Sequence, residues 1–207
     1  MQKIILMSEI RSYPDQLDAG MVSYLEEGQV ETYESFPTFD LLAFDWYDIQ
    51  DPEAPPAQII LYLNKEDLFL LCENEAARTA AETCFESGPD NWESAYRFFR
   101  SLLLGNIRHL DALEAQVAEL DDDVADGIEE GLQERLIDMR NVVLRLKKYY
   151  EGLEFLMECV CENEPSRIPP DRKPSFVILH SRTVRLVSQI NSIREYLTSV
   201  RESYQGQ

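Results

Sequence analysis

The sequence predicts an α+β protein in which a small N-terminal mixed sheet with flanking helices is followed by three long helices. Three observations support this fold class. Short β-rich runs come before residue 90, apolar residues follow helical spacing after it, and four prolines interrupt the chain between residues 163 and 174. We therefore divide the chain into an acidic α/β domain at residues 1–89, a long antiparallel helix pair at 90–164 and a final long helix at 174–207.

The N-terminal part contains short apolar runs separated by turn residues. Residues 3–7, 29–36 and 39–49 are rich in β-forming residues, and the three prolines in residues 51–57 indicate a loop. The runs at 57–63 and 68–72 flank the polar stretch NKED, which predicts a β-hairpin. Residues 74–86 are rich in Ala and Glu, so we expect a helix capped by Asn74.

Apolar residues recur at steps of three and four through most of the chain after Asp90. This spacing predicts one helix from about Asp90 to Asp126, a second from about Ile128 to Glu162, and a third from residue 174 onward. Sustained over several heptads, the pattern is typical of coiled-coil-like packing. The acids before Gly127 and the glycine itself favour a tight reversal between the first two helices.

Composition excludes several classes of function. The 207 residues carry 19 Lys and Arg against 39 Asp and Glu, a net charge of −20, which disfavours binding to nucleic acid. The longest apolar runs have five residues, so the sequence contains no membrane span and no secretory signal. The four cysteines are expected to be reduced thiols. No nucleophile elbow, phosphate loop or dinucleotide motif is present, and we expect no enzymatic activity.

The final helix combines an apolar stripe with a polar one. The polar stripe follows heptad spacing through seven residues: Ser181, Arg185, Ser188, Ser192, Glu195, Ser199 and Glu202. Such a stripe is either an ordinary solvated face or the wall of a hydrated channel, where hydroxyls and carboxylates face a lumen. The apolar register continues to Tyr204, so we expect that the sequence continued and that this chain is part of a larger protein.

Three segments of the C-terminal half resemble the cytoplasmic part of the CorA family of magnesium transporters. They are LLLGNIRHLDALEAQVAELDDDV from Leu102, LRLKKYYEGLEFLMECV from Leu144 and VRLVSQINSIREYLTSVRESYQGQ from Val184, with the proline-rich loop before the last. The resemblance spans roughly Trp92 to Gln207. In family members the last segment continues into a transmembrane helix and a Gly-Met-Asn motif, neither of which this sequence contains.

The resemblance implies a homopentameric funnel in the full-length protein, at the cytoplasmic face of the cell membrane. The α/β domain would lie at the wide end, and the final helix would be the stalk around the ion path, leading to the missing membrane helices. The cargo would be Mg²⁺, with Co²⁺, Ni²⁺ or Zn²⁺ as alternatives. This fragment alone is expected to be soluble, as a monomer or a dimer, with no nucleic acid partner.

The resemblance also implies site residues. Ser181, Ser188, Glu195 and Glu202, spaced by seven, are the candidates to face the lumen, and Glu195 and Glu202 are candidate metal ligands. The alternative for these two glutamates is a pair of exposed helix acids beside Arg194 and Arg201. Some family members hold a regulatory metal with an aspartate early in the stalk, but residues 175–194 contain no acid.

A second candidate metal site is the densest acidic cluster: Asp121, Asp122, Asp123 and Asp126. Its alternative interpretation is a solvated helix end, because runs of like charge are usually solvated. For the whole chain, the leading hypothesis is a regulatory domain that senses intracellular cation and gates a transporter. The competing hypothesis is a soluble helical adaptor for protein interactions that is unrelated to transport.

Overall fold

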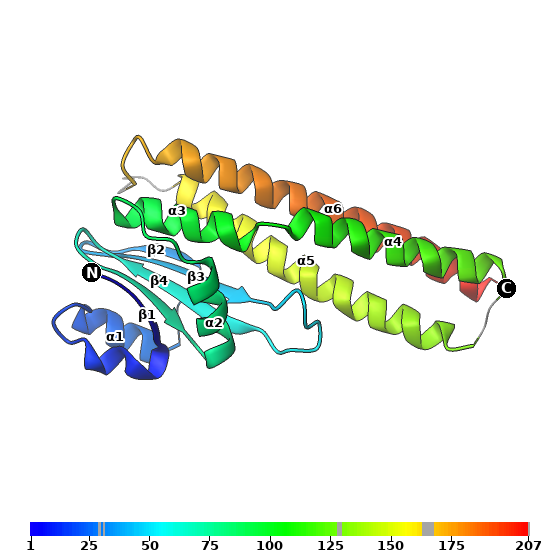
Figure 1. Ribbon diagram of the computed structural model, residues 1–207, viewed down its shortest axis with the longest axis horizontal. Coiled ribbons are helices and arrows are strands. Elements are labelled where there is room, and N and C mark those ends of the chain that lie inside the picture. The colour runs from blue at the N-terminus through cyan, green and yellow to red at the C-terminus, as the bar shows by residue number, and fades with distance from the viewer. Residues whose placement is uncertain (29, 31, 128–129, 163–167, 207) are drawn as a thin grey trace.

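The computed structural model describes residues 1–28, 30, 32–127, 130–162 and 168–206. The sheet has five strands. It lies at one end of the molecule, and long helices extend from it to the far end, where the C-terminus lies (Figure 1). None of the described helices is long and apolar enough to cross a membrane. The α+β fold class predicted from the sequence is confirmed.

The sheet is mixed, with the strand order β1-β5-β4-β3-β2. The strands are β1 (Gln2–Leu6), β2 (Tyr33–Ser35), β3 (Asp40–Trp46), β4 (Ala57–Leu63) and β5 (Leu68–Cys72). The predicted hairpin is confirmed, because β4 pairs antiparallel with β5 and Leu63 lies opposite Leu68. β1 adds to β5 in parallel, while β2, β3 and β4 pair antiparallel.

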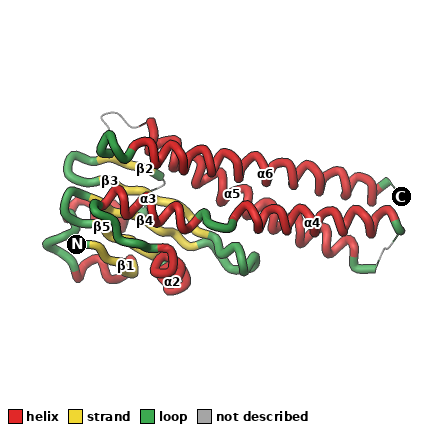
Figure 2. The backbone as a smooth tube through the Cα atoms, turned by 45° about the horizontal axis from the view of Figure 1, so that its top comes forward, coloured by secondary structure: helices red, strands yellow, loops and turns green. Residues whose placement is uncertain are grey.

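The two faces of the sheet are covered by different helices (Figures 1 and 2). The 3-10 helix η1 (Met7–Ser12) and α1 (Ala19–Glu26) pack on the face that carries Phe69 and Leu71. The opposite face, which carries Phe44 and Leu70, packs against α2 (Glu75–Cys84), α3 (Asn91–Leu102) and α5 (Leu132–Glu162). Alternate strand residues therefore enter separate cores, as the pleat requires.

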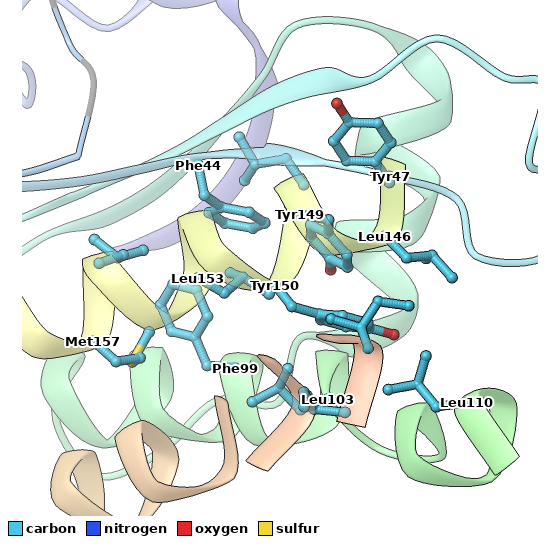
Figure 3. Close-up of a cluster of buried hydrophobic side chains, with 14 of the residues drawn as sticks. Phe44, Tyr47, Phe99, Leu103, Leu110, Leu146, Tyr149, Tyr150, Leu153 and Met157 are labelled. Carbon is cyan, nitrogen blue, oxygen red and sulfur yellow. The ribbon is translucent and has the colours of Figure 1, made fainter. Parts of the chain in front are cut away.

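The core on the face that carries Phe44 and Leu70 continues without interruption from the sheet into the long helices. Figure 3 shows Phe44 and Tyr47 from the sheet side meeting Phe99, Leu103, Tyr149 and Leu153 from the helices. The Phe44 and Phe99 ring centroids are 5.5 Å apart, and those of Tyr47 and Tyr149 are 5.7 Å apart. This shared core fixes the sheet to the C-terminal half of α5.

The predicted first long helix is wrong at one place. Residues 90–126 form two helices, α3 and α4 (Asn106–Ala125), separated by a turn at Leu103–Gly105. Gly105 has a φ of 82°, a left-handed conformation that ends the regular helix and that glycine adopts without steric cost. Apolar spacing continues across this break, which is why the periodicity alone indicates a single helix.

The three long helices are α4, α5 and α6 (Lys173–Gln205). The predicted reversal after α4 is confirmed, because the Gly127 N–H donates to the Val124 carbonyl and α5 runs back toward the sheet (Figure 1). Ile128, where the second helix was predicted to start, lies outside the described residues. α6 packs along both α4 and α5, and its longest contact is with α5.

Candidate functional site

α6 separates into the two faces that its sequence predicts. The buried face consists of eight side chains: Phe176, Leu179, Thr183, Leu186, Ile190, Ile193, Leu197 and Val200. All seven residues of the polar stripe, Ser181 to Glu202, are exposed to solvent. The apolar spacing positions this stripe, because burying one side of a helix leaves the opposite side to water.

Serine hydroxyls along the exposed face bond back to α6 itself. Ser181 Oγ donates to the Val177 carbonyl at 3.0 Å, Ser192 Oγ donates to the Ser188 carbonyl at 3.2 Å, and Ser199 Oγ donates to the Tyr196 carbonyl at 2.7 Å. Each hydroxyl has one proton and two lone pairs. With the proton used on the helix, these hydroxyls present oxygen lone pairs to the solvent, which suits contact with a hydrated cation.

Glu195 and Glu202 lie on this face near the far end of α6, and both are exposed. They border a groove between α5 and α6 together with Arg140, Arg194 and Arg201. Within the described part of the chain, neither glutamate forms an ion pair within 4.0 Å. Their carboxylates therefore remain open to water, and their role as metal ligands stays a prediction.

Two members of the acidic cluster at the end of α4 contact neighbouring helices, one on α6 and the other on α5. Asp121 Oδ2 accepts a hydrogen bond of 3.0 Å from the Tyr196 hydroxyl of α6. Asp123 Oδ2 lies 2.5 Å from Arg135 Nη1 of α5. Asp122 and Asp126 are exposed. Two of the four carboxylates thus tie α4 to its neighbours.

Across all the residues that the structure describes, no three His, Cys, Asp or Glu side chains come together as a metal-binding group. The stripe glutamates lie seven residues apart on one helix, about 10 Å along its axis. A single copy of the chain therefore brings together neither candidate set, and a cation site built from Glu195 or Glu202 needs carboxylates from further copies.

The thiols carry no sign of activation. Burial raises the pKa of Cys72 to about 12 and also raises the pKa values of Cys84, Cys159 and Cys161. A raised thiol pKa keeps sulfur protonated at neutral pH, whereas nucleophilic or metal-binding cysteines act as thiolates. All four cysteines are free.

One ion-pair cluster was not predicted from the sequence. The Arg172 guanidinium, next to the start of α6, donates to Asp90 Oδ2 from Nε at 3.0 Å and from Nη2 at 2.9 Å. Asp90 also caps α3 by accepting from the Glu93 N–H at 2.7 Å. Burial acts to raise the pKa of Asp90, but these hydrogen bonds and the Arg172 charge lower it overall. This ion-pair cluster fixes the N-terminal end of α6 to the start of α3.

One protein family matches most of the chain. A family model described as a CorA-like Mg²⁺ transporter protein matches residues 18–207. The ZntB cytoplasmic domain from Vibrio parahaemolyticus is similar in structure, with a TM-score of 0.78 and 12% identity over 98% of this chain and 85% of that one. A sequence comparison with curated proteins gave no match.

Two structures of CorA from Methanocaldococcus jannaschii are also similar. The soluble domain has a TM-score of 0.71 and 15% identity, covering 97% of this chain and 83% of that one. The complete magnesium transporter has a TM-score of 0.75 and 14% identity, covering 98% of this chain and 68% of that one. At these identities, the structural likeness concerns the fold.

Proposed function

Because this chain belongs to the CorA-like Mg²⁺ transporter family, we propose that it is the cytoplasmic regulatory part of a divalent-cation transporter. In this proposal α6 is the stalk, and copies of the chain assemble as a homopentamer with their α6 helices around a central ion path. The cargo is Mg²⁺ or a related divalent cation. The protein acts by binding and conformational change, at the cytoplasmic face of the membrane.

The observation that carries the proposal is the exposed polar stripe of α6. An isolated surface helix needs only a mixture of polar residues on its outer side. This stripe instead keeps heptad spacing over three heptads and contains only Ser, Arg and Glu. In a ring of parallel helices, residues seven apart face the axis together. The stripe then lines a hydrated path with hydroxyl and carboxylate oxygens.

Rings of carboxylates support a divalent cation as the cargo. Mg²⁺ gives up its hydration water reluctantly and is held through oxygen ligands and retained water. Five copies of Glu195 and five of Glu202 would form two acidic rings, and neither glutamate is committed to an ion pair within the described part of one copy. Such rings attract a hydrated divalent cation without requiring a closed protein cage.

The core shared by the sheet and the long helices supports the proposed regulation. α5 extends from the core beneath the sheet to the far end of the molecule, and α6 packs along it. A cation that binds between copies stabilises the assembled, closed arrangement, and loss of the cation loosens it. The long helices transmit this difference because they share one continuous core with the sheet.

The test is Mg²⁺ uptake by cells that express the whole gene, measured with a Mg²⁺-sensitive dye. We expect expression to increase uptake, and the double variant Glu195→Gln, Glu202→Gln to reduce it several-fold by removing both acidic rings. The matched control is Glu134→Gln, which removes one exposed acid from α5 and should leave uptake unchanged.

Uptake that is no higher than in cells without the gene would favour the competing hypothesis of a soluble adaptor. Equal uptake by the double variant and by Glu134→Gln would show that Glu195 and Glu202 are not part of the ion path. A further sequence check is independent of both measurements. The transporter hypothesis predicts that the coding region beyond Gln207 encodes apolar spans of about 20 residues and a Gly-Met-Asn motif.

A further inference from the structure

A groove lies between α4, α5 and the loop that follows β3, and we call it the α4–α5 groove. Its volume is about 470 Å³, which falls in the range of small-molecule sites. Its floor is apolar and consists of Leu113, Leu120, Met139, Val142 and Leu146. The groove exists because α4 and α5 both pack mainly against α6 and touch each other little.

Two contacts define how α4 and α5 face each other along the groove. The buried Tyr150 hydroxyl donates to Asn106 Oδ1 at 2.9 Å near the sheet, and Arg135 pairs with Asp123 at the far end. This antiparallel register places Arg145 level with Ala112, and His109 one turn nearer the sheet. Arg145 and His109 therefore both lie at the end of the groove beside the sheet.

Arg145 is a partly buried cation without a carboxylate partner in the described chain. Its Nη2 donates to the Ala54 carbonyl at 3.2 Å, and among the described residues no ion pair within 4.0 Å involves it. Two nearby acids of the loop each accept a backbone hydrogen bond within the loop. Asp48 accepts from the Gln50 N–H at 2.9 Å, and Asp51 accepts from the Glu53 N–H at 3.2 Å. Arg145 thus retains donors for a ligand.

The register places Glu119 opposite Asp138 about 10 Å further along the groove, and both side chains are exposed. Exposed charges interact weakly because water and salt screen them, whereas a charge that is partly removed from water interacts more strongly. Burial also lowers the pKa of His109, so its imidazole is neutral at pH 7 and has one N–H to donate. Arg145 is therefore the cation in the groove that is best placed to pair with an anion, because Arg135 is exposed and already paired with Asp123.

We propose that the α4–α5 groove binds a small amphipathic carboxylate. The carboxylate pairs with Arg145 and accepts from His109, while the apolar body lies on the floor and extends toward Asp138. A carboxylate suits a guanidinium because the two groups can form paired hydrogen bonds. The occupant would join the β3–β4 loop to both long helices. This site is independent of the proposed transport function.

Three ligands with the same alkyl chain test the proposal: decanoate, decanol and decylamine. Binding to the full chain is measured by isothermal titration calorimetry and by displacement of the fluorescent probe anilinonaphthalene sulfonate. We expect saturable binding in the order decanoate, decanol, decylamine. The charge-assisted hydrogen bonds should make decanoate about tenfold to 100-fold tighter than decanol.

Two variants and one control locate the site. Arg145→Gln should abolish the preference for decanoate over decanol, while Arg140→Gln, an exposed arginine of the same helix that lies outside the groove, should preserve it. Ala112→Trp places a large side chain at the exposed edge of the groove and should weaken binding of all three ligands. Circular dichroism checks that each variant is folded.

The comparison of the three ligands on the unmodified chain decides the question even if Arg145→Gln does not fold. The proposal fails if no ligand binds saturably, if decylamine binds more tightly than decanoate, or if decanol equals decanoate. It also fails if folded Arg145→Gln and Arg140→Gln affect decanoate equally, or if Ala112→Trp leaves binding unchanged.

Discussion

Removing the Tyr150 hydroxyl should destabilise the protein even though the volume of the core barely changes. Tyr150 and Asn106 are both buried, and their hydrogen bond joins α5 to the start of α4. Asn106 Nδ2 in turn donates to the Leu102 carbonyl at 2.9 Å, near the end of α3. The pair therefore provides a polar connection at the break between α3 and α4. Figure 3 shows that Tyr150 lies among apolar side chains.

The magnitude follows from what Tyr150→Phe leaves behind. Asn106 Oδ1 loses its buried donor, and an unsatisfied buried acceptor costs about 1–3 kcal/mol. For a chain of this size, each kcal/mol corresponds to about 2–4 °C in Tm, so we expect a decrease of about 2–12 °C. The ring remains, so the loss of hydrophobic burial is negligible.

The assay is urea unfolding followed by circular dichroism, with the Tm measured in parallel. The matched control is Tyr149→Phe, which removes the same atom from the neighbouring buried tyrosine. No hydrogen bond from the Tyr149 hydroxyl is found in the described part of the chain, so this control should change stability by less than about 0.5 kcal/mol. Equal effects of the two variants would refute the proposed role of the polar pair.

Two further predictions concern the backbone and pH. Gly105→Ala should destabilise by about 1–2 kcal/mol, because its φ of 82° strains any L-residue although the added methyl meets nothing within 4 Å. Gly152→Ala, within regular α5, should instead stabilise the protein by about 0.5–1 kcal/mol. Chemical unfolding of both variants measures whether each change lowers or raises the free energy of unfolding. Asp90→Asn keeps the helix cap but removes the charge that pairs with Arg172, so at pH 7 it should cost at most about 1 kcal/mol. The folded pKa of Asp90 lies below its ordinary value, so this advantage of the native chain is present above the unfolded pKa and should disappear as pH falls through the folded pKa. Unfolding curves of both proteins from pH 7 to pH 2 test this, and a stability difference that does not change with pH would contradict it.

Local patterns in the sequence predict much of the sheet. The runs at 57–63 and 68–72 are β4 and β5 with the predicted bounds, because continuous apolar residues between turn signals leave little alternative. The parallel pairing of β1 with β5 was not predictable, since it joins segments far apart in the chain. α1 was also missed, although Asp18 accepts from the Gly20 and Met21 N–H groups and is a recognisable helix cap.

The long helices show both the strength and the limit of periodicity. Apolar spacing correctly predicted which face of α6 is buried and therefore which face is exposed. The same spacing concealed the break at Gly105, because apolar residues remain in phase on both sides of the turn. A glycine followed by asparagine within LLLGN was the available signal.

Family membership was predictable from residues 92–207, and the family model that matches residues 18–207 confirms it. The contacts of individual site residues were not predictable. Asp121 bonds to Tyr196, and Asp90 bonds to Arg172, across 75 and 82 residues respectively. Such contacts depend on how the helices pack in space. The acidic cluster could therefore be found in the sequence, but the helices that its aspartates contact could not be predicted.

The most direct test of the central proposal is whether the α6 stripes of different copies face one another. Ser188→Cys places a thiol in the middle of the stripe, and a mild oxidant is applied to the protein in cells that express the whole gene. We expect covalent dimers from Ser188→Cys, beyond the background of the unmodified chain, and none from Glu114→Cys on the exposed side of α4. Equal cross-linking at the two positions, or none at Ser188→Cys, would contradict a central path lined by α6.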